Sequence, residues 1–439
     1  MTDRGNVPNN PTSHDLFGLD PDGFLADFHH TTRYGATENG GIDRQAATAP
    51  HGAVRDWFEE QAVARGFRVL TDEIGNIFAT KEWIPGAPYV LVGSHLDSQP
   101  LGGRFDGTYG VVAALHAADA LDRAVKDERL VPQANIAVVD WFNEEGARFP
   151  PSIMGSSVFV GLLDLENALR TVDPAGVTVS EALAETRRRG GTVDLPLAGY
   201  AEIHIEQGRR LERAGIPIGV VDRSWHTQKL LVRVVGEQSH TGATLMSDRR
   251  DALVAASHVV VMVEELVDEF TPESIVTSVG KFDVQPNSPI VVPRQVDLVV
   301  DIRADEKADV TKARALLLDR MERLAQRRNV TIDAEDFDIR PIQRFPRDAV
   351  DLGREAARQE GEESAVLATL AGHDSVALNR VTPTVMLFVP SVDGVSHCER
   401  EFTDDDDLVT GLRVLTNATA RMVTGDLSQT EPGGRLPHG

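Results

Sequence analysis

The segment from Tyr89 to Gly110 constrains the fold more than any other part of this sequence. It begins with a short apolar run, residues 90–92, bounded by turn residues, a pattern typical of a buried β-strand. From Thr108 onward, apolar residues recur at helical spacing. We therefore predict a strand, a loop and a helix of an α/β sheet, with His95 at the carboxyl end of the strand and Asp106 at the start of the helix.

Three more predicted strands carry side chains that can bind metal. Strands 135–142, 200–206 and 384–389 lead into, or contain near their ends, Glu144-Glu145, His204 and His397. The carboxyl ends of strands form the ligand-binding edge of open α/β sheets, and imidazoles with carboxylates suit a divalent metal ion. The residues alone also allow a simpler interpretation. In it, Asp106 caps its helix, the histidines are ordinary loop residues and the glutamate pair is a solvated turn.

The acidic residues at this edge can take separate roles in hydrolysis. Two metal ions bridged by one carboxylate lie roughly 3.5–4 Å apart, and Asp106 is the natural bridge because its carboxylate has two oxygens. Adjacent side chains rarely point at the same metal. One of Glu144 and Glu145 can therefore bind a metal while the other takes a proton from water.

The order of predicted elements changes between residues 223 and 340. Here strands and helices follow as β-α-β-β-α-β, which predicts a four-stranded sheet with two helices on one face, a ferredoxin-like arrangement. We expect an α/β protein of two domains. A discontinuous, metal-binding catalytic domain with a mixed sheet comprises residues 1–222 and 341–439, and residues 223–340 form an inserted domain.

Composition excludes several classes of function. The net charge is -24 and the isoelectric point is about 4.9, so a protein that neutralises nucleic-acid phosphates is not expected. Cys398 is the single cysteine, which rules out an internal disulfide. The polar residues 1–15 do not resemble a signal segment, and no apolar stretch is long enough to span a bilayer. We expect a cytoplasmic protein that does not act at a membrane.

Five motifs resemble one family and occur in its order. They are GSHLDSQPLGGRFDG, NEEGARFP, HIEQG, GEQSHTGATLMSDRRDA and GVSHCERE. Together they resemble the dimetal amidohydrolases of the hydantoinase/carbamoylase group, which includes N-carbamoyl-L-amino-acid hydrolases, allantoate amidohydrolases and β-ureidopropionases and is related to aminoacylases and dizinc carboxypeptidases. The similarity extends from about Gly35 to the closing helix. It implies a homodimer in which residues 223–340 form the lid and dimerisation domain. It also implies two divalent metal ions (zinc, or manganese, cobalt or nickel) and a small ureido or amide substrate that carries a carboxylate.

The resemblance also implies roles for individual residues. The metal ligands would be His95, Asp106, Glu145, His204 and His397, with Asp106 bridging. Glu144 would be the general base. His240 resembles the family histidine that polarises the scissile carbonyl, in many members from the partner subunit. Arg303 resembles the arginine that holds the substrate carboxylate. Without the resemblance, His240 would be taken as a loop or capping histidine and Arg303 as a surface arginine.

Other positions near the substrate are carried over with less support from their motifs. Gln228, Asn287 and Gly372 could each be a turn residue, and His373 belongs to a GHD element that supports the site or the substrate. Ile290 stands where the family usually has an asparagine that contacts substrate, and this change leaves the particular substrate open.

The expected reaction is hydrolysis of an N-carbamoyl-L-amino acid to the amino acid, carbon dioxide and ammonia. The same site could instead act on allantoate, a ureidoglycolate-type substrate or an N-acyl amino acid. A metal-containing binding protein without turnover is the non-enzymatic alternative. A serine or cysteine hydrolase is disfavoured because no nucleophile-elbow pattern occurs.

Overall fold

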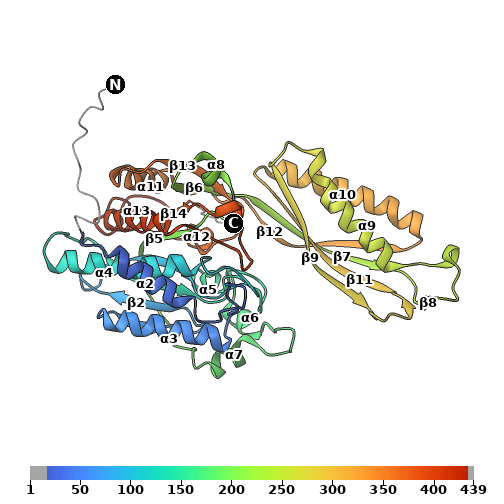
Figure 1. Cartoon of the computed structure of the whole chain (residues 1–439), viewed down its shortest axis with the longest axis horizontal. Helices are drawn as coiled ribbons and strands as arrows, with labels where there is room; N and C mark the ends of the chain where they lie inside the picture. The colour runs from blue at the N-terminus through green and yellow to red at the C-terminus, as the bar shows by residue number, and fades with distance from the viewer. Residues whose placement is uncertain (1–16, 434–439) are drawn as a thin grey trace. The chain divides into compact units, whose positions relative to one another are not determined.

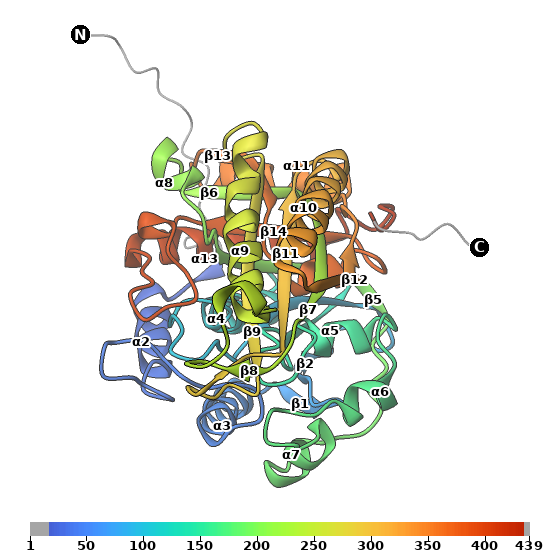
Figure 2. The ribbon, with the colours of Figure 1, turned by 90° about the vertical axis from the view of Figure 1, so that its right-hand side faces the viewer.

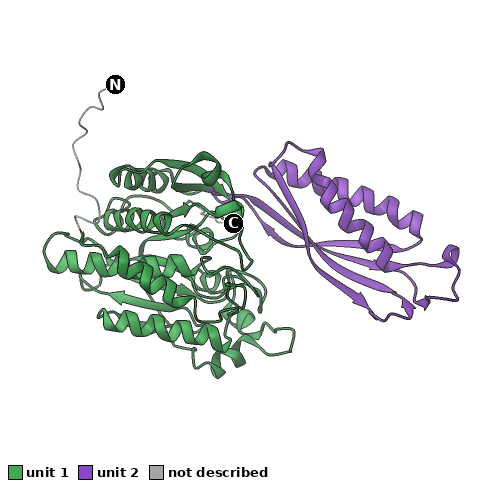
Figure 3. Ribbon diagram, viewed as in Figure 1, with its two compact units in different colours: residues 1–222, 344–439 green, residues 223–343 purple. Residues whose placement is uncertain are grey.

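A computed structural model describes residues 17–433 of the chain and divides into two compact units. Unit 1 comprises residues 1–222 and 344–439, and unit 2 comprises residues 223–343 (Figure 3). The polar stretch 1–15, in which the sequence showed no signal segment, lies outside the described residues. None of the helices within residues 17–433 has both the length and the apolar character needed to cross a membrane.

Unit 1 is built on an eight-stranded mixed sheet (Figure 1). Its strands lie in the order β1 (Arg68–Thr71), β2 (Ile77–Lys81), β4 (Asn135–Trp141), β3 (Tyr89–His95), β5 (Leu197–Ile205), β14 (Thr384–Val389), β6 (Ile218–Ser224) and β13 (Ser364–Thr369). The four neighbours β4, β3, β5 and β14 are parallel. Their carboxyl ends therefore lie at one edge of the sheet, where the sequence had placed the candidate ligands.

Helices bury both faces of this sheet. The larger core includes side chains from helices α2 (Pro21–Thr31), α3 (Ala49–Ala64), α4 (Thr108–Lys126), α11 (Arg347–Gln359) and α13 (Asp405–Val423). A smaller core beneath α12 (Asp374–Leu378) includes Trp141 and Tyr200. Short helices α5 (Met154–Phe159), α6 (Leu165–Arg170), α7 (Val179–Glu185) and α8 (Arg210–Ala214) complete the connections. Strands β4 and β14 are buried at every position, as expected for parallel strands covered on both sides.

Unit 2 has its own four-stranded antiparallel sheet and its own core. The strands lie in the order β12 (Thr331–Arg340), β7 (His226–Val235), β11 (Gln295–Ala304) and β9 (Ile275–Gln285). Helices α9 (Ala252–Glu264) and α10 (Lys307–Arg328) lie side by side on one face (Figure 2). A two-stranded ladder of β8 (Ser239–His240) and β10 (Val291–Val292) adjoins the sheet.

The mixed α/β architecture expected from the sequence is confirmed, with differences in detail. Apolar residues recur at helical spacing from 249 to 270 and predict one long helix, but α9 is shorter. The Asp251 side chain caps Val254 N–H at its start, and the chain tightens into a 3₁₀ turn after Glu264. Strands β6 and β13 were not predicted. Each has only a short apolar centre between small or polar residues, so its periodicity is weak.

Candidate metal centre

Three buried side chains from separate elements meet at the carboxyl edge of the unit 1 sheet. His95 ends β3, His204 lies near the end of β5, and Asp106 precedes α4. Asp106 Oδ1 lies 3.3 Å from His95 Nε2 and 3.0 Å from His204 Nε2. The three ligand atoms all lie within 4.8 Å of one another.

The other oxygen of Asp106 belongs to a second group. Asp106 Oδ2 lies 3.3 Å from His397 Nε2, which in turn lies 3.5 Å from Glu145 Oε2. Asp106, Glu145 and His397 again offer ligand atoms within 4.8 Å of one another. The His397 side chain is 49% exposed, whereas that of His95 is 1% exposed. The two groups therefore share one carboxylate, and the second is open to solvent.

Backbone carbonyls orient the two buried histidines. His95 Nδ1 lies 3.0 Å from Asp97 O, and His204 Nδ1 lies 2.9 Å from Ile205 O. A carbonyl only accepts hydrogen bonds, so each Nδ1 carries the proton and each Nε2 is directed at Asp106 as a potential ligand atom.

Gly107 allows this close approach. Its φ of 63° is left-handed, and a Cβ there would lie 2.3 Å from His95 Cε1. Its N–H donates to His204 Nε2 at 3.1 Å. A side chain at this position would push the imidazole of His95 away from Asp106.

Burial raises the pKa of most carboxyl groups here. The pKa of Glu144 lies well above its ordinary value because the group is desolvated, and the charge of Asp374 adds to this shift although His95 opposes it. Burial and Asp106 raise the pKa of Glu145 to about 7. For Asp106, burial acts upward, but His204 and the other histidines outweigh it and the pKa is lowered well below 3.8. So many buried carboxyl groups beside histidines are typical of a functional site.

These residues fit divalent metal ions. The first group offers two imidazoles and a carboxylate, and the second offers one imidazole and two carboxylates. Such donor sets suit zinc or manganese, and positive charge would relieve the repulsion that raises the pKa of Glu145. A divalent cofactor is therefore consistent with the chemistry of the site.

Glu144 lies beside both groups without belonging to either. It is 6% exposed, and its Oε2 lies 3.6 Å from His95 Nε2. The backbone N–H groups of Glu144 and Glu145 donate to the two carboxylate oxygens of Asp97, at 3.1 and 3.3 Å. Asp97 thus holds the glutamate loop beside β3. The sequence interpretation missed it, although its place two residues after His95 was a usable signal.

Other residues bind Asp106 through its side chain or its backbone and were also missed. Gln207 Nε2 donates to Asp106 Oδ2 at 2.7 Å. Glu401 Oε1 accepts hydrogen bonds from the N–H groups of Phe105 and Asp106, at 3.0 and 3.1 Å. Gln207 lies in the HIEQG motif, which pointed to His204 alone. Glu401 ends the GVSHCERE motif, which pointed to His397 alone.

The GHD element packs behind the first group. His373 is 2% exposed, and its ring centroid lies 4.6 Å from that of His204. Burial lowers its pKa well below 6.5, and His204 adds to this shift, so the ring is neutral. Gly372 lies in the loop between β13 and α12. His373 therefore supports the face of His204.

Gln228 and Arg303, two candidate substrate-binding residues of unit 2, lie near one end of its sheet but on opposite faces. Arg303 pairs across strands with Thr227, whereas Gln228 pairs with Ile302, the neighbour of Arg303. Directly paired residues share a face and successive residues alternate. Arg303 Nη2 donates to Asp301 Oδ2 at 2.7 Å, while Gln228 Nε2 donates to an oxygen of Asp336, also at 2.7 Å.

His240 and Asn287 lie toward the other end of this sheet. His240 follows the end of β7, and Asn287 is an exposed turn residue, with φ 54°, after the end of β9. His240 Nδ1 accepts hydrogen bonds from the N–H groups of Gly242 and Ala243, at 3.0 and 3.1 Å. Its proton is therefore on Nε2, which is a donor.

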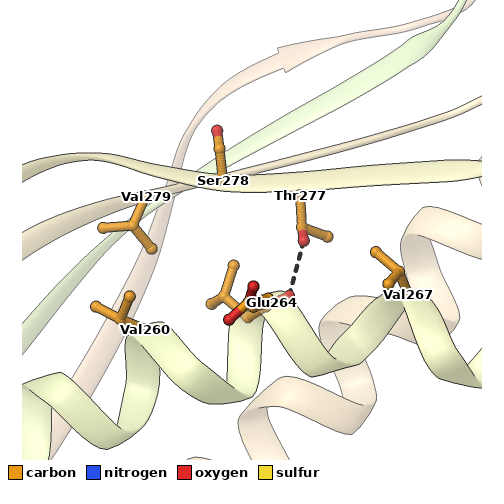
Figure 4. Close-up of a pocket in the computed structure, with 7 residues that line it drawn as sticks. Val260, Glu264, Val267, Thr277, Ser278 and Val279 are labelled. Atoms are coloured by element: carbon orange, nitrogen blue, oxygen red, sulfur yellow. Dashed lines mark hydrogen bonds between the residues drawn. The ribbon is translucent and has the colours of Figure 1, made fainter.

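A cavity in unit 2 lacks the chemistry of this centre. About 270 Å³ in volume, it is lined by Val260, Val263, Glu264, Val267, Thr277, Ser278 and Val279 (Figure 4). Thr277 Oγ1 donates to Val263 O at 2.7 Å. With a single carboxylate and no imidazole, this cavity between α9 and β9 is not a candidate metal site.

Comparison with known proteins places these observations in a family. Residues 91–421 match the peptidase family M20/M25/M40. A putative hydrolase of Mycolicibacterium smegmatis is 48% identical and covers 93% of this chain and 95% of its own length. An N-carbamoyl-L-amino acid amidohydrolase of Geobacillus stearothermophilus is 34% identical, with 89% and 96% covered.

A solved structure agrees over nearly the whole chain. A hydantoinase/carbamoylase family amidase from Burkholderia vietnamiensis superposes with a TM-score of 0.88 at 34% identity and covers 95% of this chain and 99% of its own. The chain therefore belongs to the M20/M25/M40 peptidase family, as a hydrolase related to the hydantoinase/carbamoylase amidases.

Proposed function

We propose that this enzyme hydrolyses the linear C–N bond of an N-carbamoyl-L-amino acid to give the amino acid, carbon dioxide and ammonia. The observation that carries the proposal is the shared Asp106 carboxylate between two groups of ligand atoms, with the buried carboxyl of Glu144 alongside. The name of the Geobacillus relative supports the substrate class.

In this proposal two divalent ions are held in unit 1. His95, Asp106 and His204 would hold one, and Asp106, Glu145 and His397 would hold the other. When bound, the ions would polarise the substrate carbonyl and favour deprotonation of the attacking water.

Glu144 is assigned the proton transfers. It accepts a proton from the attacking water and delivers it to the leaving nitrogen. Because burial raises its pKa, the group is a better proton acceptor than an exposed glutamate and can also release the proton to an amine. Asp97 positions it by binding the backbone of its loop.

Arg303 is assigned to the substrate carboxylate. A guanidinium offers paired N–H donors that match two carboxylate oxygens. In the structure Asp301 already accepts hydrogen bonds from Nε and Nη2 of this fork, which holds the side chain along its strand.

His240 is assigned to the carbonyl oxygen, as a donor through Nε2. It cannot act on the same substrate molecule as Arg303 of its own chain. Residues 295 and 303 lie at opposite ends of β11, which at 3.4 Å per residue are roughly 27 Å apart, and residue 295 pairs with Val235 at the His240 end. We therefore propose a homodimer in which His240 serves the site of the other copy.

The surface for such a dimer has a physical candidate. Strand β9 is an edge strand of the unit 2 sheet, and the valine-lined cavity of Figure 4 lies between it and α9. Unpaired edges invite pairing with another chain. Pairing of β9 with the other copy would cover Val254, Val261 and Val276, which are exposed on α9 and β9.

A substrate panel on metal-reconstituted enzyme tests the proposed reaction. It compares N-carbamoyl-L-amino acids, allantoate, β-ureidopropionate and N-acyl amino acids, with ammonia and carboxylate release measured separately. The proposal requires that a carbamoyl amino acid give the highest kcat/KM of the panel and release ammonia. Preference for an acyl amino acid, with carboxylate release, would replace it, and metal binding without turnover of any compound would favour a binding protein.

A further inference from the structure

A segment before the sheet contacts two of the loops that carry the proposed ligands. We call this segment, residues 35–44, the strap. Asn39 Nδ2 donates to Glu399 Oε2 at 2.8 Å, two residues after His397. Ile42 and Gly102 exchange two backbone hydrogen bonds, at 3.0 and 2.8 Å, in the loop that leads to Asp106.

Arg44, at the end of the strap, binds residues beside His95 and beside Asp106, two members of the first ligand group. Its side chain is fully buried. Nε donates to Leu96 O at 2.8 Å, immediately after His95, and Nη2 donates to Thr108 Oγ1, two residues after Asp106. A single guanidinium thus holds the residues that flank a histidine and a carboxylate 3.3 Å apart.

The remaining contacts of Arg44 also go to uncharged groups. Nη1 donates to Thr31 O at 3.0 Å, and the Arg44 backbone N–H donates to Ser98 Oγ at 3.0 Å. No acceptor among these is a carboxylate. Burial lowers the pKa of the guanidinium to about 10, although the charges of Asp140 and Asp97 oppose this shift. Burying this charge without a direct hydrogen bond to a carboxylate is costly, so its presence calls for a reason other than an ion pair.

We propose that Arg44 is a positioning residue of the metal centre, which fixes His95 and Asp106 at the separation that metal binding needs before any ion arrives. A rigid, planar fork can bind several acceptors in fixed directions, whereas a lysine ammonium cannot reproduce that geometry. The inference rests on the proposed metal ligands and goes beyond them, because Arg44 contacts neither substrate nor metal.

Gly41 supports the role of the strap in close packing. A Cβ at this position would lie 2.5 Å from Gly102 O and 2.8 Å from Glu399 Cα. The strap therefore has no spare room between the loop before Asp106 and the loop after His397.

The test compares Arg44→Lys with Arg188→Lys by metal affinity. Arg188 is 8% exposed and pairs with Asp56 and Glu59 on α3, away from the ligand loops. Metal-free proteins are titrated with Co²⁺ and Zn²⁺ against a chelator, with Co²⁺ absorption reporting coordination and thermal unfolding reporting stability. Arg44→Lys is expected to weaken metal binding about 10- to 100-fold. Arg188→Lys should leave the metal affinity within about twofold of wild type, whatever the substitution does to stability.

A second variant covers the case in which Arg44→Lys does not fold. Thr108→Val removes one acceptor of Arg44 and should weaken metal binding several-fold. Wild-type affinity in a folded Arg44→Lys or in Thr108→Val overturns the inference, as does an equal loss in Arg188→Lys. His204→Ala separates the two proposals, because unchanged metal binding in that variant refutes the ligand assignment itself.

Discussion

In unit 1 burial raises the pKa of the carboxyl groups of Glu144 and Glu145, whereas on the sheet of unit 2 arginines lower the pKa of carboxylates. Hydrogen bonds from Arg314 lower that of Asp336. For Asp338, burial acts upward, but Arg340 outweighs it and the pKa is lowered. Buried carboxyl groups that lack arginine partners reduce stability, so their retention in unit 1 points to a cation. The carboxylates of Asp336 and Asp338 in unit 2 form ordinary structural ion pairs with arginines.

The largest expected effect concerns the buried carboxyl group of Glu144. Glu144→Gln should lower kcat by about 10²- to 10⁴-fold, because the amide cannot accept the proton. Metal content and thermal stability should stay close to those of the wild type. Glu335→Gln, on the exposed sheet of unit 2, is the matched control and should retain full activity. A Glu144→Gln enzyme within tenfold of wild type would contradict the assignment.

His240→Ala should lower kcat by about 10²- to 10³-fold, as expected for loss of one donor to an oxyanion. Mixing this variant with Glu144→Gln under conditions that exchange subunits sharpens the comparison of the two units. If His240 serves the other copy, each mixed dimer has one intact site, and activity should return to about a quarter of wild type. No recovery after verified exchange would place His240 within its own chain's site.

Metal addition should stabilise the two units unequally. An ion at 100 to 1,000 times its Kd adds about 2.7–4.1 kcal/mol to the free energy of unfolding. Hydrogen exchange should slow in β3, β5 and the start of α4, whose ends carry the ligands, and remain unchanged in β7 and β11. Chelation should reverse the effect. Equal protection in both units would show that the ions do not bind selectively at the proposed ligands.

The smallest effect concerns the ion pairs of unit 2. Asp336 is paired with Arg314 at 2.8 Å and its side chain is 26% exposed, so Asp336→Asn should cost about 0.5–1 kcal/mol at neutral pH. Its pKa in the folded protein is lowered from 3.8. The contribution is therefore present above pH 3.8 and is lost as the pH falls through the lowered pKa. Chemical denaturation at pH 7 and pH 3 should show the difference from wild type shrinking, and a constant difference would contradict this origin.

The pattern in the sequence located the ligand-type residues because that pattern is local. Short apolar runs that end in His95 or Glu144 predict strand ends without knowledge of the rest of the chain. Parallel strands then bring those ends to one edge, where the structure places His95, Asp106 and His204 within reach of one another. The roles of His240 and Arg303 came from resemblance to a family, since neither residue lies in a pattern that indicates chemistry.

The residues that hold the proposed ligands could not be predicted in the same way. Arg44, Asp97 and Glu401 reach the site through hydrogen bonds to backbone groups, and such bonds place no requirement on the partner's side chain. Glu401 and Asp106 are almost 300 positions apart, so no periodicity connects them. The opposite faces of Gln228 and Arg303 follow from strand register, which depends on pairing between strands.

The sequence by itself determined the kinds of candidate ligand atoms and the strand ends that present them, because side-chain periodicity acts over a few residues. Tertiary structure decided which oxygen of Asp106 faces which histidine. It also decided that a buried guanidinium lies behind the first ligand group. These features depend on contacts between distant segments, whose geometry is fixed only when the whole core packs.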